Sequence, residues 1–241
     1  MNYLQLVNRA RRECGVSGAA NLTTLQNPAT VETQRFIDWV ADAWNDIQIS
    51  QTTWQFLRAK CEIATTAGQN VYTPAGANAT YFATGATIPT SAIPTFDSFV
   101  LSSFRCYRPA VGYGDEMLMN FLIWEDFRNL YLYGNMRTTQ QRPVAVTQAP
   151  DRSLVVGAVP DDVYNIVGEF YAHPQVLSAD TDTPLMPDQF HMLVVYKTME
   201  YYGAYESAPE VLARAQAGIS NLEPLLINHQ LPKITFNVPL A

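Results

Sequence analysis

"PDQFHMLVVYKTMEYYGAYE", residues 187–206, is the stretch that decides the fold. At helical spacing it is apolar on nearly every side, which is typical of a helix buried among several neighbours. The next residues predict a capping box, in which Ser207 and Glu210 stand three apart and Pro209 lies in the first turn. Apolar residues then step by three and four along a helix-packing seam: Leu212, Ala215, Ile219, Leu222 and Leu226. We expect Pro224 to kink or break the last turn.

Two further helices are predicted at the other end of the chain. Residues 3–14 carry an amphipathic stripe, Leu4, Val7, Arg11 and Cys14, and Gly15 is the expected stop. A longer helix is expected to open with Asn27 as its N-cap and Pro28 at its first position. Its apolar stripe consists of Phe36, Val40, Ala43 and Ile47, flanked by Trp39 and Trp44.

The texture of the sequence changes after "WQFLRA", residues 54–59. Strands are predicted at 59–65 and 70–74 around Gly68-Gln69, at 98–109, and in "RPVAVTQAP", "SLVVGAVP" and "YNIVGEFYAHP". The turn residues "PDRS", 150–153, predict that two of these strands form a hairpin. One helix, 121–134, is expected among them, closed by Gly134. No residue from Ile63 to Phe96 is charged, and we expect this loop-rich stretch to be ordered within the chain or by a partner.

Helices, then strands with one helix, then helices again indicate an α+β fold. We predict an antiparallel helical bundle built from both chain ends, with an inserted β domain and an extended C-terminal tail. The expected boundaries are 1–58 for the N-terminal part of the bundle, 59–180 for the β-rich insertion with its helix near 121–134, 181–230 for the C-terminal part of the bundle, and 231–241 for the tail.

The tail, "LPKITFNVPLA", alternates strictly between apolar and other residues. Ile234, Phe236, Val238 and Leu240 would share one face of an extended strand. Pro232 and Pro239 each remove a backbone donor, which suits an edge strand. One hypothesis is that the tail docks on another subunit or on a partner protein; the other is that it folds back on its own helices.

Composition favours contact with other proteins. Hydrophobic residues make up 48% of the 241 residues and charged residues only 15%, against about 25% in an average domain. Large subunit interfaces would use such a surface, and a generous monomeric core is the alternative. The net charge of −7 argues against a protein that reads DNA, because that binding depends on basic patches.

Several other classes of site and location are not expected. The three cysteines, Cys14, Cys61 and Cys106, are far apart in sequence and contain no C-x-x-C pair, so neither a disulfide nor a zinc site is predicted and a reducing compartment is indicated. No signal peptide and no membrane span are expected. The common catalytic and phosphate-binding motifs are absent from the sequence, and we expect no cofactor and no metal.

The remaining titratable residues fit ordinary structural roles. His173, His191 and His229 lie too far apart for a ligand pair, and His191 is interpreted as a satisfied histidine of the core or surface. Asp180, Asp182 and Asp188 lack the pattern of an EF-hand and are interpreted as a solvated loop before a helix. The pairs Glu125-Asp126 and Asp161-Asp162 are expected on exposed faces.

Two groups of side chains are candidates for contacts in an assembly. Arg9, Arg11 and Arg12 form either a solvated helix face or a dock for an acidic neighbouring subunit. Four tyrosines of one helix are candidates for core packing or for an inter-subunit face, because tyrosine is common where one edge stays wet: Tyr196, Tyr201, Tyr202 and Tyr205.

Three stretches carry a family resemblance: "NYLQLVNRARRECGVSG", "RFIDWVADAWNDIQ" followed by "WQFLRA", and "FHMLVVYKTMEYYGAYESAPEVLARA". Together with the closing "LP-ITF--PLA", they resemble the head-to-tail adaptor (connector) proteins of tailed bacteriophages. The resemblance covers both ends of the chain, and the middle, roughly 75–180, is compatible only in kind.

The resemblance implies a structural virion protein that forms a ring, typically a dodecamer, on the portal at the capsid vertex. Its partners would be the portal protein, neighbouring copies of itself and the next tail protein. Genomic DNA would pass through its channel without sequence-specific binding, and no membrane would be involved. Assembly would take place in the host cytoplasm. The docking residues would be Arg9, Arg11, Arg12, Leu231 and the four apolar residues of the tail. A tail-completion or tail-tip protein and, less well supported, a phage-associated hydrolase are the alternatives.

Overall fold

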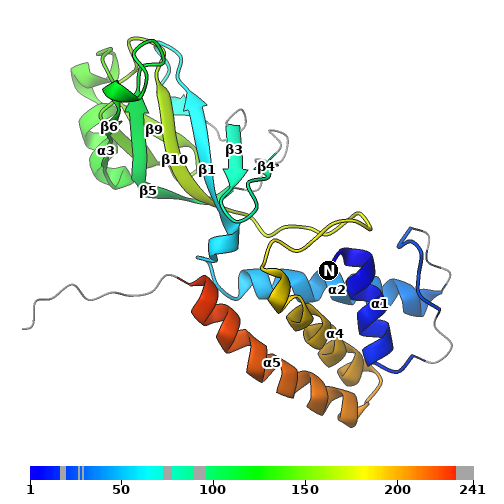
Figure 1. The fold of residues 1–241 in the computed structure, drawn as a ribbon. Helices are drawn as coiled ribbons and strands as arrows, with labels where there is room; N and C mark the ends of the chain where they lie inside the picture. The colour runs from blue at the N-terminus through cyan, green and yellow to red at the C-terminus, as the bar shows by residue number, and fades with distance from the viewer. Residues whose placement is uncertain (17–19, 27, 29, 73–77, 89–95, 232–241) are drawn as a thin grey trace, which may run out of the picture. The chain divides into compact units, whose positions relative to one another are not determined.

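The computed structural model describes residues 1–16, 20–26, 28, 30–72, 78–88 and 96–231. It divides into two compact units, which we call unit 1 (Met1–Phe56 and Pro174–Ala241) and unit 2 (Leu57–His173). Unit 1 holds the long helices and unit 2 holds the strands with one short helix (Figure 1). The α+β class predicted from the sequence is therefore confirmed.

Helix α1 (Tyr3–Glu13) is capped both by its own residues and by a distant loop. The side chain of Asn2 accepts a hydrogen bond from the N–H of Gln5, and the side chain of Gln5 accepts one from the N–H of Asn2, which is a complete capping box. The N–H groups of Tyr3 and Leu4 donate to the carbonyls of Asp182 and Asp180, at 2.7 and 3.2 Å. The loop before α4 thus satisfies donors that α1 cannot satisfy within itself.

Helix α2 (Val31–Ile49) begins later than the sequence predicts. The N-cap is Thr30, whose side chain accepts a hydrogen bond from the N–H of Thr33, so the prediction of Pro28 as the first helical residue is wrong. Threonine caps a helix by the same chemistry as asparagine, and the predicted N-cap, Asn27, lies outside the described residues. The predicted apolar stripe is confirmed, because Phe36, Val40, Ala43 and Ile47 are all buried.

Helices α4 (Met192–Tyr205) and α5 (Pro209–Gln230) correct two predictions. The N-cap of α5 is Ala208 without a side-chain hydrogen bond, and Ser207 has a φ of 52°, so the predicted capping box is wrong. The sharp turn between the two helices takes Ser207 out of the extended conformation that an N-cap requires. Helix α5 continues through Pro224 to Gln230, so the proline does not break it.

The helices of unit 1 pack around α4, which contacts α1, α2 and α5. Leu193, Val194, Val195 and Met199 of α4 are fully buried, as its nearly uniform apolar surface predicts. Trp54 adds to this core by stacking on Phe56, with ring centroids 5.3 Å apart.

Unit 2 contains two sheets, in the strand orders β4-β3-β1-β10-β5-β6 and β2-β9-β8-β7. The strands of the six-stranded sheet are β1 (Arg58–Ala64), β3 (Asn78–Tyr81), β4 (Thr87–Ile88), β5 (Phe96–Tyr107), β6 (Met117–Leu118) and β10 (Asn165–Ala172). Those of the four-stranded sheet are β2 (Val71–Tyr72), β7 (Asn120–Phe121), β8 (Ala145–Gln148) and β9 (Leu154–Gly157). Short 3-10 helices cover Gln55–Leu57, Tyr113–Asp115, Gly134–Arg137 and, in unit 1, Asp188–Phe190.

The strand pairs are antiparallel except for β7 and β8, which are parallel. Strands β8 and β9 form the predicted hairpin, in which Ala145 faces Gly157 and Gln148 faces Leu154. Strands β1 and β2, which flank Gly68-Gln69, lie in different sheets. Part of the uncharged stretch forms the β3–β4 pair, and its residues 73–77 and 89–95 lie outside the described residues.

The four-stranded sheet is buried on two faces, which explains its continuous apolar runs. Val146, Leu154 and Val156 share a core with the six-stranded sheet. Ala145 and Val155 point the other way and pack with Phe127 of α3 (Trp124–Tyr131). This helix is shorter than the predicted 121–134, because Asn120 and Phe121 form β7 and Gly134 starts a 3-10 helix.

Gly168 lets an aromatic ring lie directly on the six-stranded sheet. A Cβ at this position would stand 2.4 Å from the Phe104 ring, closer than any side chain can pack. The register between β10 and β5 shifts between Val167 and Glu169, so this glycine also marks an irregularity in the ladder.

Candidate functional site

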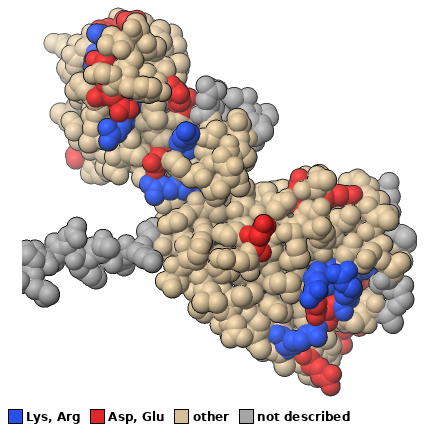
Figure 2. All heavy atoms as spheres, in the orientation of Figure 1, with Lys and Arg blue, Asp and Glu red and all other residues tan. Residues whose placement is uncertain are grey.

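The basic cluster of α1 divides into one buried and two accessible arginines. Arg11 is 9% exposed, and its guanidinium donates to the carbonyl of Ala20 at 3.3 Å. Arg9 forms an ion pair with Glu13 at 2.7 Å, and Arg12 donates to the side chain of Asn21 at 3.0 Å. Figure 2 shows basic side chains gathered on the face of unit 1 that carries α1, while most of that face is uncharged.

A hollow of about 600 Å³ lies beside these arginines. Its lining comes from α1 and its surroundings: Met1, Gln5, Asn8, Arg9, Arg12, Asn21 and Met192. Since Arg11 is turned into the protein, only Arg9 and Arg12 of the predicted docking arginines line this hollow.

Most of the four tyrosines of α4 are engaged within unit 1. The Tyr201 hydroxyl donates to Asp46, and burial, together with this carboxylate, raises the pKa of Tyr201. The ring of Tyr202 stacks on Phe36 with centroids 5.4 Å apart. The ring of Tyr196 lies so close to Gly218 of α5 that a Cβ there would stand 2.5 Å from it. Tyr205 is 53% exposed, and the Arg35 guanidinium lies 4.5 Å from its ring centre.

Exposed apolar side chains gather in unit 2, in a short part of its sequence that no motif marks. They run from the end of β5 to the end of α3: Val111, Tyr113, Met117, Leu118, Phe121, Ile123, Leu130 and Tyr133. We call this set the exposed apolar segment. Strands β6 and β7 within it are the edge strands of their two sheets, so the segment combines apolar side chains with sheet edges.

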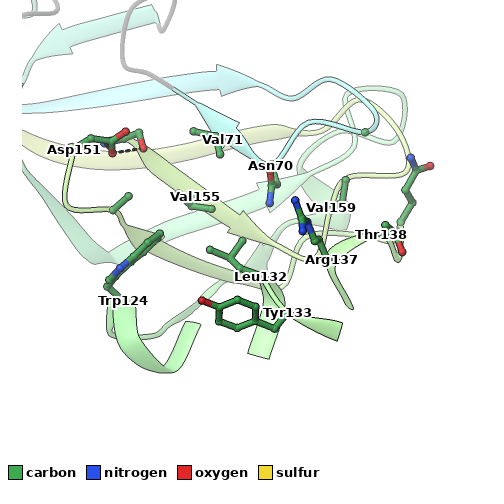
Figure 3. A pocket seen from close by; sticks show the side chains of 14 residues that line it. Asn70, Val71, Trp124, Leu132, Tyr133, Arg137, Thr138, Asp151, Val155 and Val159 are labelled. Atoms are coloured by element: carbon green, nitrogen blue, oxygen red, sulfur yellow. Dashed lines mark hydrogen bonds between the residues drawn. The ribbon is translucent and has the colours of Figure 1, made fainter. Parts of the chain in front are cut away.

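A groove of about 690 Å³ lies on the outer face of the four-stranded sheet, beside α3 (Figure 3). Val71 of β2 and Val155 of β9 form one side, and Trp124, Leu132 and Tyr133 form the other. Polar residues complete its lining: Gly68, Asn70, Arg137, Thr138, Gln140, Asp151 and Ser153. The N–H and hydroxyl of Ser153 donate to Asp151 at 3.0 and 2.6 Å, and these bonds lower the pKa of Asp151. An apolar floor with two charged side chains, Arg137 and Asp151, in the lining suits a peptide.

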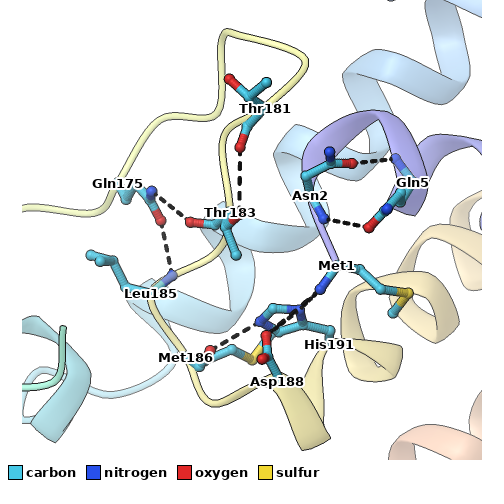
Figure 4. Close-up of polar contacts among 10 residues, drawn as sticks. All are labelled: Met1, Asn2, Gln5, Gln175, Thr181, Thr183, Leu185, Met186, Asp188 and His191. Atoms are coloured by element: carbon cyan, nitrogen blue, oxygen red, sulfur yellow. Dashed lines mark hydrogen bonds and ion pairs between the residues drawn. The ribbon is translucent and has the colours of Figure 1, made fainter. Parts of the chain in front are cut away.

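His191 is a satisfied core histidine, as the sequence indicates. It is fully buried in unit 1, with Nδ1 2.6 Å from the amino group of Met1 and Nε2 3.0 Å from the carbonyl of Met186 (Figure 4). The Asp188 carboxylate lies 3.4 Å from Nδ1. Burial lowers the pKa of His191, because it disfavours the charged imidazolium.

The acidic loop residues of the same region form local bonds. Burial acts to raise the pKa of Asp182, but the hydrogen bonds that it accepts from the N–H groups of Ser178 and Ala179 outweigh burial and lower that pKa. Asp180 accepts a hydrogen bond from the N–H of Leu25. The described part of the chain contains no group of three or more histidine, cysteine or acidic side chains placed to hold a metal ion.

The paired carboxylates lie where the sequence predicts. Glu125 and Asp126 are exposed in the first turn of α3, and Asp161 and Asp162 are exposed in a turn. Asp161 accepts a hydrogen bond from the Tyr164 hydroxyl at 2.7 Å. One pair thus lies at the start of a helix and the other in a turn. Nothing in these two positions arranges the carboxylates for catalysis.

The predicted docking tail lies almost wholly outside the described residues. Leu231 is the last described residue and is half-buried, while Ile234, Phe236, Val238 and Leu240 are among residues 232–241. Sequence reasoning missed the groove, since residues 68 to 159 line it and only the fold brings them together. The run "MLMNFLI", 117–123, was the one local signal for the exposed apolar segment.

Comparison with known proteins identifies the family. Among the described residues, no helix is long and apolar enough to cross a membrane. A search of curated proteins found no match. The family model of the SU10 adaptor protein matches residues 1–226, nearly the whole chain, and confirms the resemblance to phage head-to-tail adaptors. The chain belongs to the SU10 adaptor protein family.

Proposed function

We propose that this adaptor forms a ring, a dodecamer, that docks on the portal and joins the DNA-filled capsid to the tail. Its partners are the portal protein, neighbouring copies of itself and the next tail protein. It works in the virion, at the portal vertex, after assembly in the host cytoplasm, and it carries no enzymatic activity. The observation that carries this proposal is the family match over residues 1–226.

The helices from the two chain ends act in this proposal as one bundle that contacts the portal and the neighbouring copies. Arg9 and Arg12 line a hollow beside α1 and offer cationic groups to an acidic neighbour. Arg11 is buried and donates to the carbonyl of Ala20, so it takes no part in this contact. Of the tyrosines, Tyr205 presents the largest exposed surface to a neighbouring copy, and Tyr196, Tyr201 and Tyr202 hold α4 in place behind it.

The tail supplies an anchor. Four apolar side chains of residues 231–241, Ile234, Phe236, Val238 and Leu240, contribute about 1.5–3 kcal/mol each when buried, before the cost of ordering the segment. Repetition around a ring increases this anchoring by avidity.

Genomic DNA passes through the channel of the ring without being gripped. The net charge of −7 and the low content of charged residues suit a lumen that repels the DNA backbone. A channel lined by such a surface lets DNA slide during ejection.

The test is the mass of the purified protein, alone and mixed with portal rings, with and without residues 231–241. We expect a stoichiometric ring on the portal that is lost when the tail is removed. A ring that forms without the tail would retain the adaptor role and refute the anchor. A protein that ignores the portal would refute the proposal and favour a tail-tip or tail-completion role.

A further inference from the structure

We infer that the groove on the four-stranded sheet of unit 2 receives residues 232–241 of a neighbouring copy. This inference rests on the proposed ring and names the surface that its anchor uses. The groove belongs to unit 2 and the C-terminal end of α5 to unit 1, and the proposed segment would link unit 1 of one copy to unit 2 of the next.

The groove has an apolar floor that solvent reaches. Val155 and Val159 are buried in its floor, while Val71 is 42% and Tyr133 is 60% exposed at its margin. Exposure of these apolar side chains to water is unfavourable, and an apolar segment that covers them removes this unfavourable free energy. The aromatic rings of Trp124 and Tyr133 add flat surfaces on one side (Figure 3).

The segment has the reach and the apolar pattern of an extended ligand. Leu231, the C-cap of α5, has φ −90° and ψ 150°, so the chain leaves the helix in an extended conformation. Ten extended residues reach about 33 Å, at about 3.3 Å per residue. Alternation then directs Ile234, Phe236, Val238 and Leu240 to one side, where they meet the apolar floor.

The prolines and the charge of the segment match the margin of the groove. Pro232 and Pro239 favour an extended backbone of the kind that aromatic-lined grooves bind. Two charged side chains line the groove, Asp151 and Arg137, and Lys233 is the one charged side chain of residues 232–241. Arg137 would repel Lys233, whereas Asp151, whose carboxylate the bonds from Ser153 hold ionised, would pair with it. The pair would fix the direction in which the segment lies.

The geometry of a ring favours a neighbouring copy as the source of the segment. Each copy offers one segment and one groove, which is a head-to-tail interface, and such interfaces close into rings when the rotation permits. The same interface repeated around the ring gives avidity to a segment whose single binding is weak.

Disulfide cross-linking tests the inference on the full-length chain. The variant Val71→Cys with Phe236→Cys places one thiol at the groove and one in the segment. The native Cys14, Cys61 and Cys106 are buried, and burial raises their pKa values to about 12, 12 and 11, so they contribute little thiolate. Rings assembled on portals are oxidised mildly and analysed without reductant. The matched control is Val163→Cys with Phe236→Cys, since Val163 is 48% exposed, against 42% for Val71, and lies outside both the groove and the exposed apolar segment.

We expect a ladder of covalent multimers from the groove variant and at most a trace from the control. A disulfide within one chain, identified by peptide mapping, would overturn the neighbouring copy as occupant. No disulfide in rings that form on the portal would overturn the groove, with the segment bound to the portal instead. The mass before oxidation shows whether each variant forms a ring, and the wild-type chain is measured in the same assay. If neither forms a ring, the proposed function is refuted as well; if only the variant fails, the substitution caused the loss.

A charge exchange provides the second readout. We expect Asp151→Lys and Lys233→Asp each to slow cross-linking by about fivefold, the size of a surface ion pair with its repulsion added, and the double variant to recover most of the rate. Asp162→Lys, which reverses an exposed charge outside the groove, is the control. Equal rates in the parent, the two single variants and the double variant would remove the ion pair from the inference. Failure of the double variant to recover would contradict the assigned direction.

Discussion

The two units treat their apolar and aromatic side chains in different ways. In unit 1, the aromatic residues of α4 find partners on α2 and α5, and hydroxyls such as those of Tyr3 and Tyr201 have acceptors within the chain. In unit 2, the exposed apolar segment lies in solvent along the edges of both sheets. Each unit has its own buried core, and unit 2 in addition leaves this run of apolar side chains exposed.

This difference changes which residues are the better candidates for assembly contacts. The sequence predicts an inter-subunit face on the tyrosine-rich helix α4, but most of its hydroxyls and rings have partners within unit 1. The sequence predicts no contact surface in the segment from Val111 to Tyr133, yet this segment has more exposed apolar side chains than α4. Sequence composition measures how much apolar surface exists and does not say on which element it remains exposed.

The sharpest test of this difference deletes one phenyl ring from each environment of unit 2. We expect Phe104→Ala, at a fully buried ring between the sheets, to lower the free energy of unfolding by about 3–5 kcal/mol. Phe121→Ala, at a ring that is 45% exposed on the edge strand β7, should change it by less than about 0.5 kcal/mol. Urea unfolding followed by far-UV circular dichroism measures both.

Hydrogen exchange then shows where the loss occurs. Amides of β1, β5 and β10 should exchange faster in Phe104→Ala, while those of α2 and α4 stay protected if the two units have separate cores. Equal losses of protection in both units would contradict the division on which the comparison rests.

The next largest effect is expected where α4 packs on α5. Gly218→Ala would raise helix propensity by about 0.8–1.0 kcal/mol in an isolated helix. Its methyl group would however meet the Tyr196 ring at 2.5 Å, so we expect a net loss of about 1–3 kcal/mol in the free energy of unfolding. Thermal unfolding at several denaturant concentrations measures it.

The matched control removes the ring as well. In Tyr196→Ala with Gly218→Ala, the added methyl group has space, and the second substitution should become neutral or stabilising. If Gly218→Ala stabilises the protein on its own, Tyr196 does not occupy that site, and the tyrosine is free for a partner.

The sequence predicted well what depends on local periodicity. The stripe of α2 and the apolar surface of α4 follow directly from residue spacing, and the turn residues at 150–153 foretold the β8–β9 hairpin. Caps were less predictable, because Thr30 and Ser207 both have the side-chain chemistry of an N-cap, and only Thr30 has the extended backbone that the role requires.

Long-range arrangement could not be predicted from these patterns. Strands β1 and β2 flank one short turn and yet join different sheets, and the groove combines residues from β2, α3 and β9. No spacing rule connects Val71 to Trp124 or Asp151. The tail is the reverse case, because its alternation is plain in the sequence while residues 232–241 lie outside the described residues, so its docking stays a prediction.

A pH titration tests the internal contacts of unit 1. The pKa of His191 lies below its ordinary value, mainly because of burial, and the amino group of Met1 acts in the same direction, while Asp188 and the Met186 carbonyl oppose it. A lowered pKa in the folded state means that stability is fully present above the unfolded value of about 6.5 and is lost as the pH falls below it. We expect the free energy of unfolding to decrease between about pH 7.5 and pH 5.

His191→Asn separates this histidine from the carboxylates that titrate in every protein. The variant should be less stable at neutral pH and should show a flatter pH dependence over that range. Parallel pH profiles for the two proteins would mean that His191 does not titrate as its buried position requires.

The smallest effects on stability are expected at the surface. There, ring formation is the measurement that distinguishes the two units. Tyr205→Ala loses the Arg35 contact, worth about 0.5–1 kcal/mol at an exposed site, and Leu118→Asp should cost less than about 0.5 kcal/mol. If the exposed apolar segment is the larger interface, Leu118→Asp should weaken ring formation on the portal more than Tyr205→Ala does. The substitution places a charge in a surface that loses its water on assembly, and desolvating a charge is unfavourable. Sedimentation of each variant with portal rings measures this. The opposite order would assign the main contact to α4 in unit 1 and leave the apolar edge of unit 2 to the next tail protein.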